Sequence, residues 1–104
     1  MTTFPIPKTA GLFWIEREHW IDYVRLCADR DKLPPTYEVW TDLSERVVHR
    51  LTREGWEVIK IDVDLAQFSA WCRLNALDIN RGARIKYADG IAASRLTNRE
   101  QQKN

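Results

Sequence analysis

The chain has 104 residues, of which 44% are hydrophobic and 30% are charged, and its formal net charge is +1 at pH 7. This length predicts a single domain, and the hydrophobic fraction excludes a disordered body. The near-neutral balance gives no overall attraction to nucleic acid or to anionic membranes. No apolar run reaches the length of a membrane span, and no secretory leader is recognisable. We therefore expect a cytoplasmic protein without a membrane partner.

The ends of the chain differ in composition from its middle. Residues 1–11 hold two prolines and end at a glycine, which predicts an N-terminal arm. The apolar run at 12–15 has the length of a short strand. Residues 97–104 are polar throughout and predict a frayed C-terminal tail. A globular domain is expected between these ends, at residues 12–96.

A helical pattern follows the first apolar run, at residues 16–29. Apolar residues recur there at helical spacing and form one stripe that we expect to be buried. Tyr23 and Leu26 project from the predicted stripe, which leaves a second apolar face available for contacts. The stripe itself consists of Trp20, Ile21, Val24, Cys27 and Ala28.

The second predicted helix has clear signals at both ends. Pro34 and Pro35 exclude a helix before Thr36, whose hydroxyl is a good N-cap. The helix is expected from 37 to 54, and Gly55 then supplies a C-terminal stop. Its predicted buried stripe consists of Trp40, Leu43, Val47 and Leu51.

Alternating residues at 56–63 predict the clearest strand of the chain. Asp64 follows as the N-cap of a third helix that reaches about residue 74. A fourth helix is expected at 81–96, with Asp78 or Asn80 as its cap. The element order is therefore β-α-α-β-α-α. This predicts a small α+β fold in which about four helices pack on a two-stranded sheet.

Three segments of the chain resemble a recurring group of small bacterial proteins of uncharacterised function. They are Leu33-Pro34-Pro35-Thr36-Tyr37-x-x-Trp40, then Phe68-x-x-Trp71-Cys72, then Ala83-Arg84. The resemblance spans residues 14–88 and implies a bacterial source. It implies a shared fold rather than a shared site, and no residue inherits a role from it.

Side chains that could perform chemistry are few and scattered. Glu16 and His19 share a helix face, but the further ligands of a carboxylate-bridged metal site are missing. His49 lies opposite the predicted stripe of its helix and has no nucleophile paired with it. Cys27 and Cys72 do not form a CxxC motif and are expected as buried thiols. We expect neither an enzyme nor a bound cofactor or metal.

The C-terminal quarter is basic. Residues 81–104 carry six basic and two acidic side chains, whereas residues 1–80 carry ten and thirteen. A basic helix of this kind could neutralise phosphates, so a small nucleic-acid-binding regulator is one candidate function. The residues that would make those contacts are Arg81, Arg84, Lys86 and Arg95.

The five tryptophans favour a different function, interaction with another protein. Trp20, Trp40 and Trp71 fall on helix stripes and are expected in the core. Trp14 and Trp56 flank the two strands, where they either close the core or face another protein. The leading hypothesis is a non-enzymatic interaction or regulatory module of a bacterial cell. Its expected contact surface is Trp14, Tyr23, Leu26 and Trp56, and a homodimer is its simplest partner, since two short strands leave unpaired edges.

Overall fold

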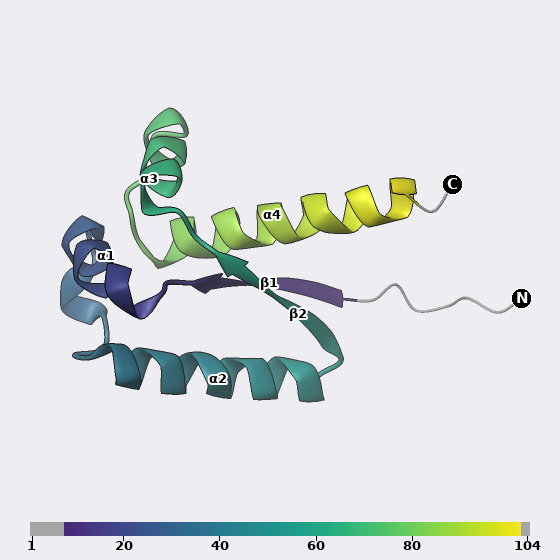
Figure 1. Ribbon diagram of the computed structural model, residues 1–104, viewed down its shortest axis with the longest axis horizontal. Helices are drawn as coiled ribbons and strands as arrows, with labels where there is room; N and C mark the ends of the chain where they lie inside the picture. Colours follow the sequence, from purple (N-terminus) through teal and green to yellow (C-terminus); the bar gives the residue numbers. More distant parts are fainter. Residues whose placement is uncertain (1–7, 103–104) are drawn as a thin grey trace, which may run out of the picture.

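The computed structural model describes residues 8–102 and has the α+β fold that the sequence predicts (Figure 1). Two short 3-10 turns, η1 at Arg17–His19 and η2 at Arg30–Lys32, flank the first α-helix. The remaining elements confirm the predicted order. They are β1 (Lys8–Trp14), α1 (Trp20–Leu26), α2 (Tyr37–Arg53), β2 (Trp56–Asp62), α3 (Leu65–Leu74) and α4 (Arg81–Gln102).

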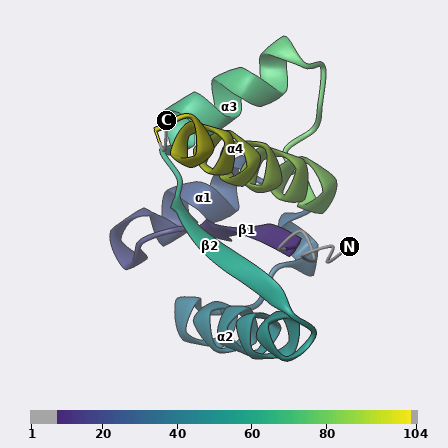
Figure 2. The same cartoon turned by 90° about the vertical axis from the view of Figure 1, so that its right-hand side faces the viewer.

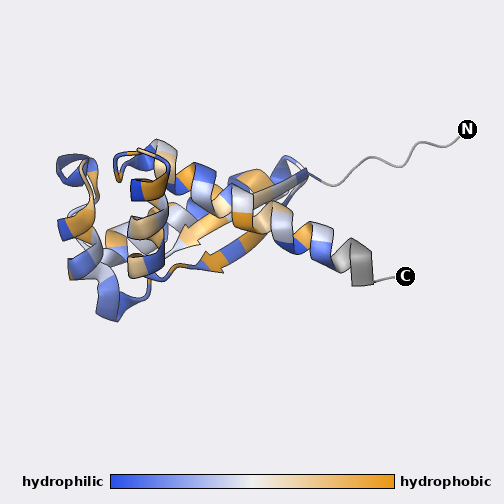
Figure 3. Cartoon of the chain, turned by 90° about the horizontal axis from the view of Figure 1, so that it is seen from above, coloured by the Kyte–Doolittle hydropathy of each residue, from blue (hydrophilic) through white to orange (hydrophobic). Residues whose placement is uncertain are grey.

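The sheet consists of two parallel strands between layers of helices. β1 and β2 pair in register, from Lys8 opposite Trp56 to Trp14 opposite Asp62. Parallel neighbours need a crossover connection, which α1 and α2 provide. α2 covers one face of the sheet, while α3 and α4 lie on the other (Figures 1 and 2). The apolar residues of both strands, orange in Figure 3, lie alongside α4.

The first strand begins earlier than the sequence predicts. Residues 8–11, expected in the arm, belong to β1 and pair with the start of β2. Gly11, which suggested a loop, instead lies where a helix packs closely on the strand. A Cβ at Gly11 would lie 2.2 Å from the backbone oxygen of Ala88, so its absence lets α4 approach the strand. Residues 1–7 of the predicted arm lie outside the described residues.

The predicted helix caps are confirmed. In each case a side-chain oxygen accepts a hydrogen bond from a backbone N–H in the first turn. Gly55, which follows α2, has a φ of +91°, as expected for a residue that ends a helix. The cap acceptors are Thr36 for α2 at 3.2 Å, Asp64 for α3 at 3.0 Å and Asn80 for α4 at 3.0 Å.

Two helices differ in length from the prediction. α1 occupies only 20–26 of the predicted 16–29, because the chain turns to an extended conformation at Cys27. α4 continues to Gln102, so residues 97–102 of the predicted tail are helical, and 103–104 lie outside the described residues. No glycine or proline follows Leu96 to stop the helix. None of the described helices has the length and apolar character needed to cross a membrane.

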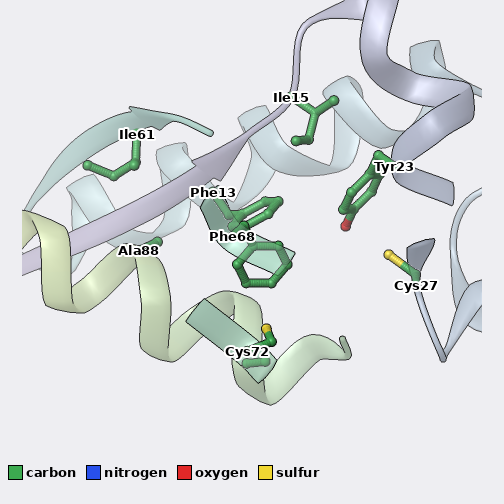
Figure 4. Close-up of a cluster of buried hydrophobic side chains, with 9 residues drawn as sticks. Phe13, Ile15, Tyr23, Cys27, Ile61, Phe68, Cys72 and Ala88 are labelled. Carbon is green, nitrogen blue, oxygen red and sulfur yellow. The ribbon is translucent and has the colours of Figure 1, made fainter. Parts of the chain in front are cut away.

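The core lies between the sheet, α1, α3 and the first half of α4 (Figure 4). Phe13 of β1 is at its centre, with its ring centroid 4.9 Å from that of Phe68 and 5.8 Å from that of Tyr23. α4 contributes small residues, so its backbone can lie close to the strand. The buried residues are Phe13, Ile15, Tyr23, Cys27, Ile61, Phe68, Cys72, Ala83, Ala88 and Ala92.

The predicted buried stripe of α1 is correct at Trp20, Val24 and Cys27 and wrong at its edges. Tyr23, expected outside the stripe, is 1% exposed, whereas Ile21, expected inside it, is 64% exposed. Both faces of this helix are apolar, so periodicity alone could not choose between them. The Tyr23 ring fills the space between Phe13 and Trp20, and this larger burial decides the orientation.

We expect Gly11→Ala to destabilise the fold by about 3 kcal/mol, because the new methyl group would collide with the α4 backbone. Urea unfolding measures the change. Gly90→Ala is the matched control, since nothing lies within 4 Å of a Cβ there. This control should gain about 0.5–1 kcal/mol from helix propensity. Equal stability of the two variants would contradict the close packing of α4 on β1.

Candidate functional site

The two strand-end tryptophans of the predicted contact surface lie far apart. The strand register places Trp14 and Trp56 at opposite ends of the sheet, about 20 Å from each other. The Trp14 ring packs 5.0 Å from that of Trp40, and the Lys60 ammonium lies 4.0 Å from its centroid. Trp56 lies beneath the Lys8 ammonium at 5.3 Å. Both side chains are half-buried.

The other two predicted contact residues separate as well. Tyr23 is buried in the core and unavailable to a partner. Leu26 is 37% exposed and lines a depression of about 580 Å³ between α1 and α3. The expected surface of Trp14, Tyr23, Leu26 and Trp56 therefore does not exist as one patch, because their elements point these side chains in different directions.

Arg84, a predicted phosphate contact, is engaged within the protein. Its guanidinium donates two hydrogen bonds to the Asp29 carboxylate, at 2.9 and 2.8 Å. The two side chains are 12% and 15% exposed. The hydrogen bond from Arg84 holds the pKa of Asp29 below its usual range. This pair ties the start of α4 to the loop after α1, so the Arg84 charge is already neutralised.

The remaining basic residues do not form one stripe. Arg81 and Lys86 point about 140° apart around the α4 axis. Arg95 lies about 21 Å along the helix from Arg81. The predicted phosphate surface of Arg81, Arg84, Lys86 and Arg95 is therefore broken into separate positions.

The structure reveals a different site, at the free edge of β1. Trp14 accepts a hydrogen bond from the Val63 N–H, so the backbone groups of the even-numbered β1 residues face β2. In a parallel pair, the N–H and C=O of one residue point the same way. The backbone groups of Thr9, Gly11 and Phe13 therefore face away from β2, toward the open edge.

Two helices flank this edge and make it a groove, which we call the β1-edge groove. α2 forms one wall and α4 the other, and the enclosed cavity is about 390 Å³. The floor is lined by residues 10–13 of β1. The walls are Trp40, Val47, Arg50 and Leu51 from α2, and Arg81, Arg84, Ile85 and Asp89 from α4.

Charge within the groove is partly compensated. Asp89 accepts a hydrogen bond of 2.8 Å from the Gly11 N–H through Oδ1, which occupies one backbone donor of the edge. Arg84 is neutralised by Asp29. Arg50 and Arg81 have no ion pair among the side chains described, those of residues 8–98. Two guanidinium groups therefore flank an apolar floor without a carboxylate partner.

Apolar surface remains uncovered on both walls. Ile85 of α4 is 49% exposed and Leu43 of α2 is 44% exposed. On a helical wheel, Leu43 lies about 20° from Arg50, so it belongs to the groove side of α2. No residue of α2 is fully buried. The predicted core stripe of α2 is therefore a wall with an exposed apolar flank.

One signal for this site is present in the sequence, outside the apolar stripes of the helices. Arg81, Ile85 and Asp89 recur at intervals of four residues and share one face of α4. Their meaning depends on β1 lying beside that face, which is a tertiary relation between residues about 70 positions apart.

Side chains with potential for chemistry are dispersed. Within the described part of the chain, no group of three His, Cys, Asp or Glu residues could hold a metal ion. Among the described residues, the one close contact between a histidine and a carboxylate joins His19 and Glu18, 3.6 Å apart on the surface. Cys27 and Cys72 are buried free thiols, as predicted, and burial raises the pKa of both.

Comparisons with protein-family models, with curated proteins and with solved structures gave no significant match. The function of the groove must therefore be inferred from its own geometry.

Asp29→Asn should destabilise the protein by about 3 kcal/mol at pH 7, because it leaves the Arg84 guanidinium without its partner in a poorly hydrated position. The wild type should lose this contribution as the pH falls below about 4. The loss follows because the pKa of Asp29 is lower in the folded than in the unfolded chain. Urea unfolding between pH 2 and pH 7 measures both effects.

Asp42→Asn is the control for this experiment. It removes one partner of the exposed Arg46–Asp42 pair, so it should cost less than about 1 kcal/mol. An Asp29 variant as stable as this control would show that the buried pair does not anchor α4.

Proposed function

We propose that this protein is a non-enzymatic interaction module that binds an extended segment of polypeptide in the β1-edge groove. One observation carries the proposal: the backbone groups of Thr9, Gly11 and Phe13 face an open sheet edge between two helices. An exposed edge is a template for another strand. Strand addition obtains affinity from main-chain hydrogen bonds and specificity from the pockets beside them.

The groove offers both components. Side chains of an added strand would alternate between the α2 wall, with Val47 and Leu51, and the α4 wall, with Ile85. Covering Ile85 and Leu43 would remove apolar surface from water, which favours binding. The unpaired guanidinium groups of Arg50 and Arg81 favour a partner that brings a carboxylate.

The observed features support binding of a strand better than binding of a phosphate. The described α4 cations are separated, and Arg84 is paired, so residues 8–98 offer no continuous positive surface to a nucleic acid. The groove, in contrast, combines unpaired backbone, apolar walls and two free cations in one place. We further propose that the module acts in the bacterial cytoplasm, which rests on the sequence expectation alone.

Displayed peptides of about twelve residues with alternating polar and apolar positions provide a test. We expect selected peptides to slow hydrogen exchange of the Thr9 and Phe13 amides. Ile85→Asn should weaken their binding at least tenfold, since about 1.5 kcal/mol of apolar burial is lost. Isothermal titration calorimetry measures the affinities.

Leu74→Asn is the matched control for this test. Leu74 is 87% exposed, at the end of α3 and outside the groove lining, so its replacement should leave peptide affinity unchanged. Binding at the β1 edge would be contradicted if hydrogen exchange slowed only in other elements. It would also be contradicted if Ile85→Asn and Leu74→Asn bound the peptides equally well.

A further inference from the structure

We propose that the strand received by the β1-edge groove is β1 of a second copy of this chain, which creates a symmetric dimer with a four-stranded sheet. The inference rests on the proposed function and specifies its partner. A twofold axis perpendicular to the sheet would pair the two β1 strands antiparallel, and like helices would meet on each face.

The positions of the exposed apolar residues point to such an axis. α2 and α4 run opposite to β1 (Figure 1). Gly11 lies against Ala88, and Trp14 lies against Trp40. With about 3.3 Å per strand residue and about 1.5 Å per helix residue, Leu12 is level with about position 86 of α4 and position 44 of α2.

These levels are close to those of two exposed residues: Ile85, which lines the groove, and Leu43, which lies on the groove side of α2. An axis through Leu12 would therefore place each of them at the same level as its own equivalent in the second copy. On the α4 side, where the helix packs on β1, the two Ile85 side chains would then cover each other. A single unrelated peptide in the groove has no such reason to find the two residues at one height.

The charges on α4 are complementary to themselves about the same point. Arg81 and Asp89 lie four residues before and four residues after Ile85, on one helix face. When two α4 helices pair antiparallel about Ile85, Arg81 of each copy lies opposite Asp89 of the other. The guanidinium that lacks a partner in the single chain thereby gains a carboxylate.

The backbone of the strand fits the same axis. With Leu12 facing its equivalent, Gly11 lies opposite Phe13 of the second copy, and both present their backbone groups at the edge. The Gly11 N–H would donate to the Phe13 carbonyl oxygen of the second copy, and the reverse bond forms with it. Asp89, which accepts from Gly11 in the single chain at 2.8 Å, would transfer to Arg81 of the second copy.

Reciprocal charge reversal tests this arrangement. Sedimentation equilibrium should show a dimer for the wild type. In a dimer of the Arg81→Glu variant, the new glutamate would face Asp89, which has the same charge. In a dimer of the Asp89→Arg variant, the new arginine would likewise face Arg81. Each variant alone should therefore dimerise at least tenfold more weakly. An equimolar mixture should restore wild-type dimerisation, since both ion pairs form with correct signs in the mixed dimer.

Arg95→Glu makes the same change of charge on α4 outside the groove and should dimerise like the wild type. Circular dichroism of each variant establishes that it is folded. If the mixture remains as weak as its components, or Arg95→Glu disrupts the dimer equally, the antiparallel α4 pairing is wrong.

The outcome also separates this inference from the proposed function. A wild type that stays monomeric at millimolar concentration, yet binds displayed peptides at the β1 edge, overturns self-pairing and supports the module. A wild type that neither dimerises nor binds peptides overturns both.

Discussion

The close approach of α4 to β1 is the contact on which the rest of the fold depends. At Gly11 the strand has no side chain, and Ala88 of α4 lies directly against its backbone. Two parallel strands have little stability of their own, so they require helices on both faces. Because α4 lies so close, it can also supply the Asp89 carboxylate to the strand edge.

The same arrangement that stabilises the sheet also leaves one of its edges unpaired. The helices cover both faces of β1 and β2, but nothing in the described part of the chain pairs with the outer edge of β1. Natural proteins usually protect such edges with charges, twists or covering segments. Three residues of β1 direct their backbone groups outward, and in one of them, Gly11, the N–H donates a hydrogen bond to Asp89. The protection is partial, because only the Gly11 N–H is bonded in this way.

Much of the secondary structure could be predicted from local signals. The caps at Thr36 and Asp64 and the stop at Gly55 depend on chemistry within a single turn, and the structure confirms them. The α2 boundaries and β2 were predicted to within about one residue. The start of β1 was missed because Gly11 resembles a loop residue until the neighbouring helix is known. The edges of the buried face of α1 were misplaced because both sides of the helix are apolar, and only packing against Phe13 places Tyr23 inside.

The sequence by itself therefore determined the order of the elements and their caps, since these depend on nearby positions. The tertiary structure alone decided which charges are free and which backbone groups are unpaired. Arg84 is a candidate surface cation in the sequence, but Asp29, 55 positions away, neutralises it. The β1-edge groove likewise joins residues of β1, α2 and α4 that are distant in the chain. Such relations depend on how the layers pack, and no local pattern contains them.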